Sequence, residues 1–138
     1  MTNADYMHLM NQWAIAQHGA AFVAAPHVNA FPEAGATTSL RCCFSDDTPN
    51  HLQLWFTFDV LDENNVEDLA ELLEANDEID AQADGLGYFA CLTEEGVDRF
   101  AWVVRMPFNP ATSANDLQHA VTQGRAHAIA RWHAALPA

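Results

Sequence analysis

Apolar residues first recur at helical spacing near the start of the chain. The stretch begins at Asn3, a candidate helix cap, and Gly19 offers a stop at its far end. One face of this predicted helix is apolar, and it carries Tyr6, Leu9, Met10 and Trp13. The spacing predicts an amphipathic first helix, whose apolar face is either core or a partly exposed docking surface.

A second helical pattern begins after Asn65, which is a candidate N-cap, and has Glu67 and Asp68 in its first turn. Apolar positions are frequent enough to predict a helix that buries two sides, with its first left-handed stop at Gly85. The face contains Val66, Leu69, Ala70, Leu73 and Asn76, and it is widened by Leu72 and Ile79.

Five stretches alternate between apolar and polar residues and predict strands. Between the last two strands, Glu94-Glu95-Gly96 provides a short hairpin loop in which Gly96 can take a positive φ. The predicted strands cover 27–31, 38–44, 52–60, 86–92 and 100–106.

The last helical pattern starts at Ser113, which stands three residues before Asp116 as in a capping box. Gly124 lies on the same face as the apolar residues, where a close neighbour would explain its cost in a helix. That face is made of Leu117, Val121, Ala128 and Trp132. The full order predicts one α+β domain over residues 1–138, an antiparallel sheet with three helices in the order α-β-β-β-α-β-β-α.

Charge is strongly acidic and unevenly placed. The chain has 19 acidic residues, five arginines and no lysine, for a net charge of −14. Fourteen of the acids lie in 59–98, which has no basic residue, whereas four of the arginines follow from Arg99 onward. This balance argues against nucleic acid as a partner and is compatible with either a solvated acidic face or the steering of a basic polypeptide.

Targeting and redox signals are absent from the sequence. No apolar run approaches the roughly 20 residues of a membrane span, and Met1 is followed by polar residues instead of a signal peptide. The three cysteines, two of them adjacent, give no disulfide framework or zinc knuckle. We therefore expect a cytoplasmic protein that does not associate with membranes.

Catalytic motifs are also absent. The seven histidines do not form H-E-x-x-H, and Gly85-Leu86-Gly87 precedes a strand and not a helix. A nucleophile and base could be imagined only in Cys42 and His51, with no third group to orient them. We expect no enzyme activity, no metal and no cofactor.

Several short segments resemble the class I type III secretion chaperones, the Tir-chaperone (CesT and SycE-like) family. Leu72-Leu73-Glu74-Ala75-Asn76 is similar to the family's helix ending in L-x-x-A-N, and Gly85-Leu86-Gly87-Tyr88 and the Glu94-Glu95-Gly96 turn follow it. Arg105-Met106-Pro107-Phe108 and a final helix reaching Arg131-Trp132 look like the closing segment. The likeness covers about 52–132, while 20–47 departs from it.

The resemblance implies a homodimer in the bacterial cytoplasm. Such a protein binds the N-terminal region of one secreted effector, keeps it extended and soluble, and presents it to the secretion apparatus, including its ATPase, without using ATP itself.

Two sets of residues are predicted to carry these contacts. We expect the dimer to form through Leu69, Leu72, Leu73, Ile79 and Trp102, because a wide apolar helix face beside a hairpin suits an isologous contact. We expect apolar grooves on the first helix and first sheet to bind the effector through Tyr6, Leu9, Met10, Trp13, Phe31, Leu40, Phe44 and Leu54.

Two other functions remain open from the sequence. An acidic immunity or antitoxin-like inhibitor would neutralise a basic toxin through the 59–98 surface, with strong salt dependence. A small-molecule-binding or hydrolytic α+β domain would need a convergent set of polar pocket residues, which the sequence does not indicate.

Overall fold

A five-stranded antiparallel sheet with three helices makes up the chain, as a computed structural model of residues 1–19, 22–31, 38–80 and 87–136 describes it. The predicted fold class and order of elements are confirmed. The helices are α1 (Asn3–His18), α2 (Val66–Asp80) and α3 (Ala114–Ala135). The strands are β1 (Val28–Phe31), β2 (Ser39–Cys43), β3 (His51–Val60), β4 (Gly87–Glu94) and β5 (Val97–Pro107), arranged β1-β2-β3-β5-β4.

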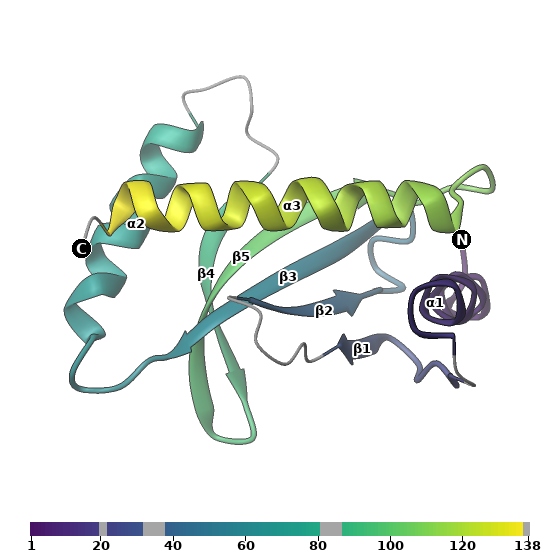
Figure 1. Cartoon of the computed structure of the whole chain (residues 1–138), viewed down its shortest axis with the longest axis horizontal. Coiled ribbons are helices and arrows are strands. Elements are labelled where there is room, and N and C mark those ends of the chain that lie inside the picture. The colour runs from purple at the N-terminus through teal and green to yellow at the C-terminus, as the bar shows by residue number, and fades with distance from the viewer. Residues whose placement is uncertain (20–21, 32–37, 81–86, 137–138) are drawn as a thin grey trace.

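The helices take different places around this sheet. In Figure 1, α3 crosses one face of the sheet, α1 is seen end-on beside β1 and β2, and α2 stands at the opposite side near β4. The same face of the sheet carries a row of apolar side chains that runs across four paired strands: Leu40, Phe56, Trp102 and Phe89. The core therefore lies between this face and the helices.

The close approach of α3 to the sheet depends on Gly124. A Cβ at this position would lie 2.7 Å from Cε2 and 2.8 Å from Cζ of Phe56, which is fully buried. The predicted close neighbour of Gly124 is thus a ring in the middle of the sheet. Leu117, Val121 and Ala128 complete the buried face of the helix.

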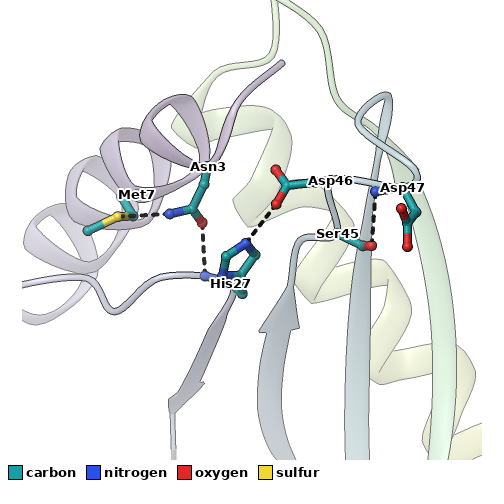
Figure 2. A network of polar contacts seen from close by, with 6 residues as sticks. All are labelled: Asn3, Met7, His27, Ser45, Asp46 and Asp47. Atoms are coloured by element: carbon teal, nitrogen blue, oxygen red, sulfur yellow. Dashed lines mark hydrogen bonds and ion pairs between the residues drawn. The ribbon is translucent and has the colours of Figure 1, made fainter.

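Helix ends mostly follow their local sequence signals. Ser113 and Asp116 form the predicted capping box of α3, and Gly19 ends α1 with a φ of 67°. The predicted cap of α1 was wrong by one residue, because Thr2 forms a capping box with Asp5. The Asn3 side chain instead accepts a hydrogen bond from the backbone N–H of His27 and donates one to Met7 Sδ, as Figure 2 shows.

The Asn3 contact belongs to a polar network that joins α1 to the turns of the sheet. His27 has a positive φ of 64°, and its ring nitrogen Nε2 lies 3.1 Å from Asp46 Oδ2. In the neighbouring turn, the Asp47 N–H donates to Ser45 Oγ (Figure 2). These contacts fix the entry to β1 against the start of α1.

α2 buries less than the sequence predicted. Leu72 is the one fully buried apolar side chain among its described positions, while Val66 and Leu73 are about half exposed. The helix is instead tied to β4 by Asn76, whose side-chain amide donates to the Phe89 carbonyl and accepts from the Phe89 N–H. This pair of bonds occupies the edge of β4, which would otherwise be open to another strand.

Two details of α2 also differ from or lie beyond the sequence prediction. Asn65 precedes the helix, but its side chain accepts from the Asp62 N–H and donates to the Val60 carbonyl instead of capping the first turn. The predicted stop at Gly85 falls outside the described residues. In the β4–β5 loop, Glu95 and Gly96 have the positive φ values of a tight hairpin turn, which confirms the role predicted for Gly96.

We expect Gly124→Ala to lower the free energy of unfolding by about 1–3 kcal/mol, because the new methyl group meets the buried Phe56 ring and overpacking outweighs the gain in helix propensity. Urea denaturation measures this change. The double variant Gly124→Ala with Phe56→Leu should recover part of the loss relative to Phe56→Leu alone. A Gly124→Ala protein more stable than the parent would contradict the contact.

Candidate functional site

A long groove runs between α3 and β5. Its volume is about 1050 Å³, at the upper end of the range usual for ligand pockets. On one flank, α3 faces α1 and β2, where Trp13 Nε1 donates to Gln118 Oε1 at 2.9 Å and Arg125 Nε donates to Thr38 Oγ1. The groove lies along the other flank, which we call the free flank of α3.

The free flank is a regular stripe of residues spaced alternately four and three apart. This spacing keeps side chains on one side of a helix along its whole length. Three of the six are alanine, so the helix presents a shallow wall: Asp116, Ala120, Gln123, His127, Ala130 and Ala134. The opposite wall and floor come from β5, through Trp102, Val104 and Met106.

Trp102 provides an unusual donor at the floor. Its side chain is 3% exposed, and its indole Nε1 has no hydrogen-bond partner among the described residues. The ring lies over Gly87, where a Cβ would come within 2.4 Å of its Cζ2 atom. Gly87 therefore lets the indole occupy this position, while the unpaired N–H carries a desolvation cost of about 1–3 kcal/mol.

The walls of the groove are richer in basic groups than the rest of the molecule. Arg105 and Arg131 line it, together with His119 and His127. Among the described residues that line it, the one acid is Asp116, whose carboxylate accepts hydrogen bonds from the Ser113 N–H and Oγ. The groove thus differs in charge from the acidic 59–98 stretch.

The predicted effector-binding residues lie elsewhere, inside the protein. All eight are at most 6% exposed: Tyr6, Leu9, Met10, Trp13, Phe31, Leu40, Phe44 and Leu54. The expectation that they line open grooves was wrong, because α1 and the sheet cover one another. The amphipathic pattern predicted correctly that these side chains pack against apolar surface, and that surface belongs to the same chain.

A buried polar network explains why α1 stays in place. The Tyr6 hydroxyl donates to the Cys42 carbonyl and accepts from Asn29 Nδ2, both at 2.8 Å. The Asn29 side chain also bonds to the backbone of Ala25. Burial raises the pKa of Tyr6 far above its ordinary value, so the hydroxyl remains protonated and keeps donating.

The residues predicted to form the dimer contact do not share one exposed surface. Leu72 and Trp102 are buried by their own chain, which corrects their assignment to an accessible interface. Leu69 is partly buried against the core, and Leu73 is 48% exposed. The Ile79 side chain lies outside the described structure. Among the described members of this set, Leu73 alone presents a large apolar surface.

Potential catalytic groups do not converge in the described part of the chain. Cys42 pairs with Leu54 across β2 and β3, whereas His51 pairs with Pro107 across β3 and β5, so the imagined nucleophile and base belong to different rows. No group of three or more metal-binding side chains occurs among the described residues.

The comparisons with known proteins concern the fold. No family model matches the chain, and no curated protein matches its sequence. Its structure is similar to the crystal structure of E. coli YbjN, described as a "putative transcription regulator", with a TM-score of 0.55 and 13% identity over 85% of this chain and 81% of that one. At this level of identity the likeness concerns the arrangement of helices and strands alone. Within the described residues, no helix is long and apolar enough to cross a membrane.

The groove was not predicted, because the sequence of α3 shows one clear apolar face, and the groove lies beside that face. The stripe containing Ala120, His127 and Ala130 has a regular spacing that was readable in the sequence. Alanine, glutamine and histidine in such a stripe do not indicate a binding wall without knowledge of the neighbouring strand. The β5 contribution of Trp102 was assigned to a dimer contact instead.

We expect Cys91 to be the only cysteine of the native protein that reacts rapidly with a thiol reagent near pH 8. Burial raises the pKa of Cys43 to about 11 and that of Cys42 further, so both thiols remain protonated. Cys42 is buried and Cys43 is partly buried, whereas Cys91 is exposed although its pKa is also raised. Stopped-flow labelling should lose its fast phase in Cys91→Ser. Equally fast reaction of Cys42 in the folded protein would contradict its buried position.

Proposed function

We propose that the protein is a type III secretion chaperone that binds the N-terminal region of a secreted effector in extended form. It keeps that region soluble and competent for secretion, and it does so without ATP. The observation that carries this proposal is the open groove along the free flank of α3, which is long, walled by small side chains and floored by apolar ones. The resemblance of its short segments to the type III secretion chaperones supports the proposal at the level of sequence pattern.

The groove suits a polypeptide better than a small metabolite. Its volume of about 1050 Å³ exceeds what a compact ligand needs, and it follows a helix of 22 residues instead of closing into a cavity. The alanines of α3 allow a bound backbone to approach closely, while Val104 and Met106 offer apolar contact to its side chains. Methionine adapts readily to different bound side chains.

A dimer formed through α2 is the second part of the proposal. Val66 and Leu73 lie seven residues apart on this helix and are both about half exposed, so they can form a contact between copies that leaves the groove open. Such a dimer would act in the bacterial cytoplasm and pass its client to the secretion apparatus and its ATPase. A stable monomer in light scattering at micromolar concentration would contradict it.

We do not propose a role in transcription for this chain, although the description of the YbjN structure names one for that protein. A protein with a net charge of −14 repels the phosphates that DNA-binding proteins must neutralise. Its five arginines are outnumbered by 19 acidic residues, and it has no lysine.

An inhibitor of a basic toxin is the alternative function, and one feature of α2 favours it. Glu67, Glu71 and Glu74 are exposed and fall on one side of the helix. An inhibitor would use this acidic surface against a folded basic protein, whereas a chaperone would use the groove against an extended segment.

We expect a photo-crosslinking amino acid at Ala130, inside the groove, to capture the N-terminal segment of a secreted protein in the cells that produce this chain. The same amino acid at Glu71, on the acidic surface of α2, should capture little of that protein. Mass spectrometry of the crosslinked products identifies both the partner and the segment.

The position of the crosslinks separates the two functions. Capture at Glu71 of a folded basic protein, with none at Ala130, would support the inhibitor and contradict the chaperone. Crosslinks at Ala126, which is exposed on α3 outside the groove, serve as the control for chance encounters.

A further inference from the structure

We propose that the groove along the free flank of α3 selects an acidic amphipathic segment, whose carboxylates contact the basic walls while its apolar side chains rest on β5. This inference rests on the proposed function, because it specifies the chemistry of the bound segment. It is carried by two independent features of the groove, the charge of its walls and an indole N–H at its floor that has no partner among the described residues.

The walls of the groove carry positive charge, whereas the whole protein has a negative net charge. Arg105 lies exposed on β5 and Arg131 is half-buried on α3, and both line the groove. Asp116 at one end is already engaged by the α3 cap. At physiological salt, electrostatic interactions are screened over about 8 Å. The interaction of a bound segment with these arginines is therefore stronger than its interaction with the distant acidic residues. The walls therefore favour a segment that carries carboxylates.

The histidines of α3 extend this character along the groove. His119 and His127 are exposed, stand eight residues apart on α3, and both line the groove. An imidazole can donate a hydrogen bond to a carboxylate in either protonation state. The α3 wall of the groove thus carries polar donors that are interspersed with alanines.

The floor also favours an acceptor. The Trp102 indole can only donate, and its buried Nε1 has no partner in the part of the chain that the structure describes. A carbonyl or carboxylate oxygen placed beside it by a small shift of the ring would relieve the cost of this unpaired group. Because Gly87 has no Cβ, its backbone lies against this part of the ring, and an acceptor would have to approach Nε1 from the side that Gly87 does not cover.

Apolar contacts complete the recognition. Val104 and Met106 point from β5 toward α3, whereas Arg105 starts from the opposite face of the strand and lines the groove at the end of β5 that extends beyond its pairing with β4. A segment in which large apolar residues alternate with glutamate would match this arrangement. A segment with lysine in place of glutamate would bring like charges together.

A pair of synthetic peptides tests the inference. The first is a short fluorescein-labelled peptide in which leucine and phenylalanine alternate with glutamate, and the second has lysine at every glutamate position. Fluorescence anisotropy with the full-length protein at physiological salt measures both dissociation constants. We expect the glutamate peptide to bind at least about tenfold more tightly, a difference of about 1.4 kcal/mol.

Two matched pairs of variants locate the binding. Arg105→Glu should weaken the glutamate peptide about tenfold, whereas Arg99→Glu, the same change on β5 outside the groove, should alter its affinity less than twofold. Ala130→Trp should fill the groove and abolish binding, whereas Ala126→Trp on the exposed side of α3 should not. Circular dichroism confirms that each variant folds.

The outcomes distinguish this inference from the proposed function. If the lysine peptide binds more tightly and Ala130→Trp abolishes its binding, the groove holds a client but the acidic preference is overturned. If neither peptide binds, or if Arg105→Glu has no effect, the acidic preference is likewise overturned. If Ala130→Trp converts a dimer to a monomer in sedimentation, a second copy occupies the groove and the inference is wrong.

Discussion

The contact between Gly124 and the Phe56 ring determines how α3 sits on the sheet. Because a side chain at this position would collide with a fully buried ring, the helix axis can approach the strands only where glycine stands. That approach directs one flank of α3 toward α1, through Gln118, and leaves the other flank beside β5. The core and the groove are therefore two results of one packing constraint.

This arrangement moves the candidate binding surface away from the N-terminal half. α1 is held by the Tyr6 and Asn29 network beneath it and by the Asn3 contact at its start, so its apolar face completes the core. A client binding there would have to displace α1. The groove along the free flank of α3 requires no such opening, and it carries basic groups that the acidic chain lacks in 59–98.

Local sequence signals predicted most of the fold, because alternation, capping boxes and positive-φ glycines act over a few residues. The same reasoning found the close neighbour of Gly124 without identifying Phe56. It could not place the site, since periodicity shows that Tyr6 and Met10 face apolar surface but not whether that surface belongs to a partner. Local signals also could not show whether Trp102 is buried within its own chain or lies at an interface. Its burial depends on the pairing of β4 with β5 and on the packing of α3 against the sheet, both of which are long-range contacts.

Solvent access to the groove in the free protein tests this account most directly. A cysteine introduced as Ala130→Cys, in a Cys91→Ser background, reports on it through the rate of labelling by a thiol reagent. The account predicts labelling at the rate of an exposed thiol, independent of protein concentration, followed by protection when a client segment is bound. Labelling as slow as that of the buried Cys42 would show that the groove is already filled and would contradict the account.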